Sequence, residues 1–219
     1  MEIRAAARLV PLRSDRERTV LAALAIDLGS PVSREILTER LWDDDPPVNA
    51  LDLLYGYLSR LRRAFRDAAL LSGPDSPAPE IVRAAHTYTL EAEPTAVDWH
   101  RYLRLAGRAR TLAEAGDDRA SLAEYGQADV LWHGEALAGL PGLWARSARA
   151  RMVEERLALN LNRYLIELRL GRFTELVPEL SRQLELHPGN ESVARHLLVA
   201  LYGGSRRYPD GLVFDEQAL

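Results

Sequence analysis

The strongest constraint on the fold is a helical pattern over residues 48–67. Apolar side chains recur there at alternating spacings of three and four, which forms one stripe along a helix: Leu51, Leu54, Leu58, Leu61 and Phe65. At about 100° per residue, the opposite side carries mostly polar residues: Asn49, Asp52, Gly56, Ser59, Arg60, Arg63 and Arg66. The pattern predicts a helix with one face in a core and the other in solvent.

Arginine is concentrated on the polar side of this helix. Residues 59–66 hold four arginines and no acid, in a chain whose net charge is −4. Guanidinium groups along one face are typical of a helix that docks into a nucleic-acid groove. A solvated helix face has the same appearance, so the pattern alone leaves both interpretations open.

Two shorter helices are predicted before this one, each with start and stop signals. The first begins at Ser14, with Glu17 at capping-box spacing, and ends at Gly29. Its apolar residues keep helical period: Val20, Leu21, Leu24 and Leu28. The second covers residues 34–42 and is capped by Ser33. We expect its buried face to contain Ile36, Leu37 and Leu41.

A β-hairpin is predicted after the three helices, with strands over residues 80–83 and 87–90. Its connection lacks glycine, which predicts that the turn is not a favoured two-residue type. Three helices followed by a hairpin is the order of a winged helix-turn-helix. In that fold the third helix enters the major groove, and the hairpin wing touches flanking phosphates.

The rest of the chain predicts an all-α unit, and we place the boundary near Pro94. Helices rich in Ala and Leu are separated by turn signals at residues 115–118, 170–173 and 202–205. Gly171 and Gly204 are 33 residues apart, close to the tetratricopeptide period of about 34. The expected fold class is mainly α, with a winged helix-turn-helix domain over residues 1–93 and a tetratricopeptide-like helical domain over residues 94–219.

Composition excludes several classes of protein. The chain has no cysteine, which excludes disulfides and thiolate metal sites. No apolar run is long enough to span a membrane, and the amino terminus lacks a signal-peptide core, so we expect a cytoplasmic protein. The five histidines show no metal-ligand spacing, and no phosphate loop or nucleophile elbow occurs. We therefore expect no enzyme activity, no cofactor and no metal ion.

Several phrases of the sequence resemble the Streptomyces antibiotic regulatory protein family. In the amino-terminal half these are VSREILTERLW at residues 32–42, DDPP at 44–47 and YLSRLRRA at 57–64. In the other half they are VDW at 97–99, LWHGEAL at 131–137 and EERL at 154–157. LWHGEAL is similar to the family phrase Leu-Trp-Arg-Gly-Glu-Pro-Leu. The shared order of these phrases, from about Leu12 to Tyr202, carries the resemblance.

The resemblance implies an OmpR-type winged helix joined to a bacterial transcriptional activator domain of tetratricopeptide-like helices. It implies an activator of a secondary-metabolite biosynthetic gene cluster, which binds direct repeats in promoter DNA and contacts RNA polymerase. Residues 1–92 hold 12 arginines and 14 acids, so salt-dependent affinity for DNA would be modest unless a homodimer or the polymerase adds contacts.

The candidate DNA-binding residues follow from this combination. Near the base edges we place the polar side chains at the start of the third helix: Asn49, Asp52, Tyr55 and Ser59. On the phosphates we place three arginines of that helix: Arg60, Arg63 and Arg66. At the wing we place Arg83, Thr87 and Thr89.

The chain also departs from the family pattern. Only about eleven residues precede Leu12, where the family has a longer strand region. Asp52 would repel phosphate, and the wing lacks the family's Gly pair and Arg. Pro209 blocks a continuing helix, which predicts a last repeat without its second helix. These departures favour an alternative: a relative that does not bind DNA and acts as a helical interaction or small-molecule-binding protein, with a recruited biosynthetic role.

Overall fold

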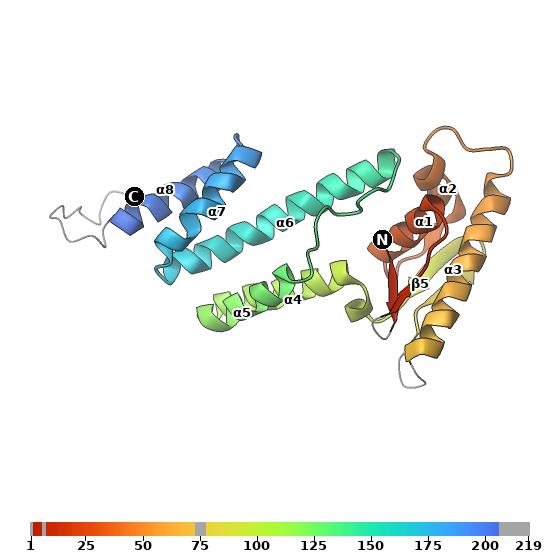
Figure 1. Cartoon of the computed structure of the whole chain (residues 1–219), viewed down its shortest axis with the longest axis horizontal. Coiled ribbons are helices and arrows are strands. Elements are labelled where there is room, and N and C mark those ends of the chain that lie inside the picture. Colours follow the sequence, from red (N-terminus) through yellow and green to blue (C-terminus); the bar gives the residue numbers. More distant parts are fainter. Residues whose placement is uncertain (1, 6–7, 73–77, 206–219) are drawn as a thin grey trace. The chain divides into compact units, whose positions relative to one another are not determined.

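A computed structural model describes residues 2–5, 8–72 and 78–205 of the chain (Figure 1). The fold is mainly α, with a winged helix-turn-helix followed by tetratricopeptide-like helices, and this confirms the predicted fold class. Contacts divide the chain into two compact units. Unit 1 contains Met1–Leu105 and Ala128–Glu154, and unit 2 contains Ala106–Gln127 and Glu155–Leu219. The domain boundary near Pro94 stays a prediction.

Unit 1 contains the winged helix. Its elements are β1 (Ile3–Ala5), β2 (Arg8–Val10), α1 (Asp15–Ile26), β3 (Val32–Ser33), α2 (Arg34–Trp42), α3 (Ala50–Ser72), β4 (Glu80–Ala84), β5 (Thr87–Glu91) and the 3-10 helix η1 (Pro94–Ala96). Two long helices contribute to both units: α4 (Asp98–Glu114) and α6 (Leu143–Arg169).

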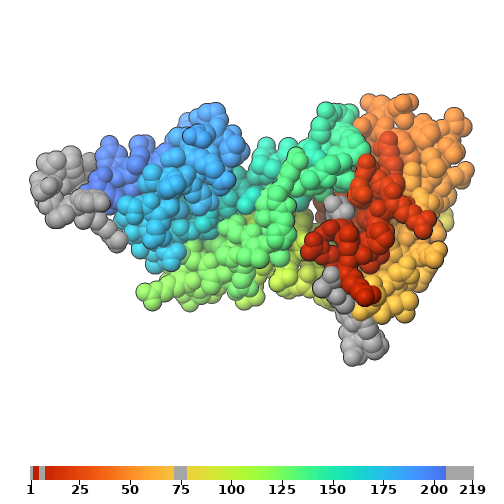
Figure 2. Space-filling model, in the orientation of Figure 1, coloured from red at the N-terminus to blue at the C-terminus, as the bar shows by residue number. Residues whose placement is uncertain are grey.

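The sheet of the winged helix has the order β3-β5-β4, with antiparallel pairs throughout. A second, two-stranded sheet pairs β1 with β2, and Ile3 lies opposite Val10. These two strands were not predicted, because three-residue strands are too short to show a period. Val10 packs with Ala64 and Ala68 of α3. Figure 2 shows the red surface of these strands beside the orange and yellow surface of α3.

The core of the winged helix joins α1, α2, α3 and the three-stranded sheet. Leu24, Leu37, Leu54 and Ile81 are among its fully buried members. The prediction that Ile36 and Leu51 are buried is wrong, because Ile36 is 42% exposed and Leu51 is 40% exposed. Leu37 and Leu41 define the buried face of α2, and Ile36 lies about 100° away from Leu37. Leu51 lies in the first turn of α3, ahead of the buried stripe.

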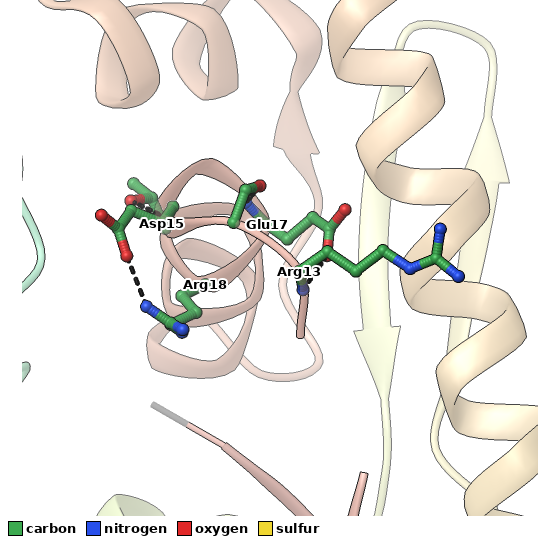
Figure 3. Close-up of polar contacts among 6 residues, drawn as sticks. Arg13, Asp15, Glu17 and Arg18 are labelled. Carbon is green, nitrogen blue, oxygen red and sulfur yellow. Dashed lines mark hydrogen bonds and ion pairs between the residues drawn. The ribbon is translucent and has the colours of Figure 1, made fainter. Parts of the chain in front are cut away.

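The predicted helix caps are confirmed at both Ser14 and Ser33. The Ser14 hydroxyl accepts from the Glu17 N–H at 3.2 Å, and the Ser33 hydroxyl accepts from the Ile36 N–H at 3.1 Å. The Glu17 carboxylate accepts the N–H of Arg13 at 2.8 Å (Figure 3), one residue before the donor of a capping box. This contact fixes the start of α1.

The wing turn differs from the expected one. The register pairs Ala84 with Thr87, which leaves Ala85 and His86 as a two-residue turn. The expectation that missing glycine excludes such a turn is therefore wrong. Ala85 adopts a φ of +51° instead, a left-handed conformation that costs a non-glycine residue roughly 1–2 kcal/mol.

Asp43 closes α2 and also contacts α6. Its backbone has a φ of +54°, and its N–H donates to the Glu39 carbonyl at 2.8 Å. Its carboxylate accepts the N–H of Leu143, at 2.9 and 3.1 Å for the two oxygens. Arg40 lies over the Trp144 ring at 5.3 Å. The first turn of α6 is therefore held by Asp43, which lies 100 positions earlier in the chain, and by Arg40.

Unit 2 consists of helices that pack in pairs. It adds α5 (Asp118–Asp129), α7 (Phe173–Leu186) and α8 (Glu191–Ser205) to parts of α4 and α6. Gly116 and Gly171 adopt positive φ at the turns predicted there. Tyr164, Leu168, Leu176, Leu180 and Ala200 form the core that joins α6, α7 and α8.

The turn predicted at residues 202–205 is wrong, because α8 continues to Ser205. Gly203 lies against Phe173, so closely that an added Cβ would be 2.4 Å from the ring. Gly203, and Gly204 beside Thr174, therefore allow α8 to pack closely against the start of α7. The predictions for Pro209 and the last repeat lie outside the described residues. Within the described part of the chain, no helix is long and apolar enough to cross a membrane.

Candidate nucleic-acid interface

The buried stripe of α3 fixes the direction of its polar face. Leu54, Leu58, Leu61 and Phe65 are at most 5% exposed. Six predicted DNA-binding residues are exposed at or near this helix: Asn49, Asp52, Ser59, Arg60, Arg63 and Arg66. Tyr55 is half-buried and packs against the core. The structure therefore brings the predicted residues of this helix to one side of it.

The four arginines of α3 fall into two classes. Arg60 and Arg62 are two residues apart, so they lie on opposite flanks of the polar face. Arg62 donates to the Ile81 carbonyl of β4 at 3.0 and 2.9 Å. Arg63 and Arg66 lie between these flanks, and neither forms an ion pair with any residue that the structure describes. Among the four arginines of α3, Arg63 and Arg66 are therefore the two whose guanidinium groups form no ion pair or hydrogen bond with a described residue.

Arg60 is held by a buried carboxylate. Glu17 of α1 is only 3% exposed, and it forms an ion pair with the Arg60 guanidinium. The same guanidinium lies 5.0 Å from the centre of the Tyr57 ring. Glu17 also accepts the Arg13 N–H (Figure 3). Sequence reasoning missed this pair, because no local pattern brings residues 43 positions apart into contact. The DNA contact of Arg60 stays a prediction.

Arg83 of the wing contacts Tyr55 of α3 and Tyr88 of the neighbouring strand β5. The Arg83 guanidinium lies 5.6 Å from the centre of the Tyr55 ring and 5.9 Å from that of Tyr88. Arg83 is exposed, while Thr89 is half-buried. The Thr87 hydroxyl donates to the Ala84 carbonyl at 2.9 Å, and it therefore supports the wing turn.

Arg34, which sequence reasoning missed, lies beside the wing and is paired with Glu35 at 2.7 Å. Hydrogen bonds to Glu35 and Tyr55 raise the pKa of Arg34, and the hydrogen bond from Arg34 lowers the pKa of Glu35. The Arg34 N–H donates to the carbonyl of His86 in the wing turn at 2.9 Å. The sequence shows that Arg34 directly follows the Ser33 cap. It does not show that Arg34 lies beside the wing, because that position depends on the pairing of β3 with β5.

The described residues form no group of three or more His, Asp or Glu side chains that could hold a metal ion. Two features of the candidate interface are acidic: Asp52 and Asp67 are exposed on α3 together with Arg63 and Arg66. The arrangement therefore presents positive charge along part of a helix face, and acids at intervals. Such a surface can bind a polyanion and can also accept hydrogen bonds from base amino groups.

Residues 97–208 match the model of the bacterial transcriptional activator domain. The chain is 33% identical over 193 residues to the regulatory protein DnrI of Streptomyces peucetius, which covers 87% of this chain and 71% of DnrI. It is 32% identical over 199 residues to the transcriptional regulator RedD of Streptomyces coelicolor, with 90% of this chain and 55% of RedD covered.

A solved structure of Mycobacterium tuberculosis EmbR, in complex with a low-affinity phosphopeptide, is similar in fold. The TM-score is 0.82 at 24% identity, with 91% of this chain and 52% of the EmbR chain covered. This likeness shows the fold alone. The matched domain and the Streptomyces relatives show the family. The chain belongs to the Streptomyces antibiotic regulatory protein family of transcriptional regulators.

Proposed function

We propose that this chain binds promoter DNA, with α3 in the major groove and the β4–β5 wing on flanking phosphates. The observation that carries the proposal is the position of Arg63 and Arg66. Both project from the exposed face of a helix whose other face is fixed in the core, and neither pairs with an acid that the structure describes. Guanidinium groups in this arrangement can meet phosphates without breaking an internal contact.

The base-reading residues lie near the amino-terminal end of α3. Asn49, Asp52 and Ser59 are exposed. The Tyr55 ring of α3 contacts Arg83 of the wing. The Asp52 carboxylate accepts hydrogen bonds only, so it selects bases with an amino group in the major groove, chiefly cytosine. Arg60, Arg83, Thr87 and Thr89 complete the proposed interface at its two edges.

The wider role is activation of a secondary-metabolite biosynthetic gene cluster. Membership of the family supports promoter DNA with direct repeats as the target, bound by two copies of the chain as a homodimer. The match to the bacterial transcriptional activator domain supports a contact between the helical domain and RNA polymerase. In vitro transcription from a promoter with one or two repeats tests this role: activation should need both repeats and the full chain.

The DNA contact itself is tested with mixed-sequence duplex DNA at low salt. The double variant Arg63→Ala/Arg66→Ala should bind at least about tenfold more weakly than the wild type, because two phosphate contacts are lost. The double variant Arg101→Ala/Arg104→Ala is the matched control, since it removes the same charge from exposed positions of α4. Equal affinities for the two double variants would contradict the proposal.

The second candidate function is that of a relative that does not bind DNA and acts by helical interactions or by binding a small molecule. The pairing of Arg60 with Glu17 and the exposed Asp52 favour it, since both reduce the attraction for phosphate. The same titration separates the two functions. No measurable binding of the wild type to either mixed-sequence or family-type repeat DNA would favour the second.

A further inference from the structure

Unit 1 contains a cavity of about 680 Å³. Its walls come from α1, α3, the start of α4 and residues 131–137, all of which belong to that unit. Binding sites for small molecules have volumes of about 300–1,000 Å³. The cavity therefore has the size of a ligand site.

Three aromatic rings form one wall of this cavity. Trp99 stacks on Tyr102 with ring centres 5.7 Å apart, and Trp132 contacts them at 6.3 and 5.8 Å. Trp99 and Trp132 are only half-buried, although they belong to this packed cluster. Both residues and Tyr102 line the cavity. A flat aromatic molecule can stack on such a wall.

Apolar side chains line the cavity from α1 and α3, and four of them are alanines. Ala22 and Ala25 line the cavity from α1, and Ala68 and Ala69 line it from α3. His100 of α4 connects α4 to α1, since its Nε2 lies 2.8 Å from the Ala25 carbonyl oxygen. Mostly apolar walls give bound water few hydrogen-bond partners, so an apolar molecule replaces that water favourably.

The irregular segment at the cavity is fixed by Arg149. This guanidinium donates to the carbonyls of Ala136 and Leu137 at 2.9 Å each and to that of Leu140 at 3.3 Å. Leu137 has a φ of +51°, and this strained conformation persists because its surroundings hold it. The wall that includes Trp132 is therefore formed without a ligand, which lowers the cost of binding.

The charges at the cavity disfavour anions. Its lining contains the acids Glu2, Asp98 and Glu135, against the single arginine Arg4. Glu2 pairs with Arg4, and Glu135 pairs with Arg149 outside the lining at 3.1 Å. Asp98, which is exposed at the start of α4, forms no ion pair with a described residue, and His133 also lines the cavity. A carboxylate or sulfonate on the ligand would meet this negative charge.

We propose that the cavity binds a neutral, largely apolar small molecule with a flat aromatic ring system. The site does not include the exposed face of α3, so this proposal stands independently of DNA binding. Two probes with one scaffold test it. N-phenylnaphthylamine is neutral, and its sulfonated analogue anilinonaphthalenesulfonate carries one negative charge. Probe fluorescence should show saturable one-to-one binding of the neutral probe, and the sulfonate should bind at least about tenfold more weakly.

A cavity-filling variant locates the site. Ala69→Phe places a ring in the cavity from α3, and it should weaken binding of N-phenylnaphthylamine at least about tenfold. Ala123→Phe is the matched control at an exposed position of α5 outside the cavity, and it should leave the affinity unchanged. Circular dichroism and thermal unfolding check that both variants are folded.

A second pair of variants is independent of the filling variant. Trp132→Ala removes part of the aromatic wall and should weaken binding of N-phenylnaphthylamine. Trp42→Ala removes a half-buried tryptophan outside the cavity lining and should leave this binding unchanged. The proposal is overturned if the neutral probe does not bind the wild type, or if the sulfonate binds equally well. Unchanged binding in both Ala69→Phe and Trp132→Ala would overturn it too.

Discussion

Two parts of α3 use the same residue type for different purposes. On the flank that faces α1, Arg60 pairs with the buried Glu17. On the outward face, Arg63 and Arg66 have no acidic partner in the described part of the chain. The difference comes from about 100° of rotation per residue. A run of arginines is therefore no measure of a DNA-binding surface until each guanidinium has been followed to its neighbours.

The acidic segment after α2 divides in the same way. Asp43 caps the first turn of α6, while the adjacent Asp44 and Asp45 are exposed. In both segments some charged residues stabilise the fold, while others face solvent. The variants below test this division and extend it to the wing turn and to unit 2, from the largest expected effect on stability to the smallest.

Arg60→Ala should have the largest effect, because it leaves the Glu17 carboxylate buried without its cation. Breaking a fully buried pair costs about 3–5 kcal/mol. The Arg60 side chain is 44% exposed, so we expect the free energy of unfolding to fall by roughly 2–3 kcal/mol after allowance for solvent screening. Urea denaturation measures this change.

Arg63→Ala is the control for that experiment, with an expected change within about 0.5 kcal/mol. The double variant Glu17→Gln/Arg60→Met should recover part of the loss, because it removes the buried charge and keeps an apolar stem against Tyr57. If Arg60→Ala and Arg63→Ala unfold at the same urea concentration, the division of α3 into two parts is wrong.

Asp43→Ala should lower the free energy of unfolding by about 1–2 kcal/mol, since it removes the cap from the Leu143 N–H. Alanine also fits the positive φ of this position no better than aspartate. Hydrogen exchange at the first amides of α6 should accelerate as well. Asp44→Ala is the matched control and should leave both quantities unchanged. Equal exchange rates in the two variants would show that Asp43 is as dispensable as its neighbour.

Ala85→Gly should raise the free energy of unfolding by about 0.5–1 kcal/mol, because glycine adopts the left-handed conformation of the wing turn without strain. Ala84→Gly, at the last residue of β4, should instead destabilise the protein by a few tenths of a kcal/mol or more. Thermal unfolding of the two variants provides the comparison. A loss of stability in Ala85→Gly would contradict the strained turn.

Glu167→Gln extends the comparison to unit 2 and should have the smallest effect. Burial raises the pKa of Glu167, opposed by the ion pair with Arg163 at 2.9 Å. A carboxyl with a raised pKa stabilises the fold below its unfolded pKa, and this contribution is lost as pH rises through the folded pKa. The variant should therefore gain stability relative to wild type as pH rises above the unfolded pKa of about 4.3. A difference independent of pH would contradict this.

Local signals in the sequence predicted much of the fold. Ser14 and Ser33 cap their helices as expected, and the period of three and four identified the buried stripe of α3 apart from Leu51. Contacts between distant residues were not predictable in this way. The pairs of Glu17 with Arg60 and of Asp43 with Leu143 depend on the packing of whole helices. The sequence therefore predicted which face of α3 is exposed, but it did not predict which arginines on that helix form internal contacts.

The salt dependence of DNA binding tests the central claim most directly. The slope of log K against log salt changes by about 0.9 for each phosphate contact. Relative to wild type, Arg63→Ala/Arg66→Ala should therefore have a slope shallower by about 1.8, while Arg101→Ala/Arg104→Ala should keep the wild-type slope. Equal slopes for wild type and the Arg63/Arg66 variant would contradict the claim that these two guanidinium groups meet the phosphates.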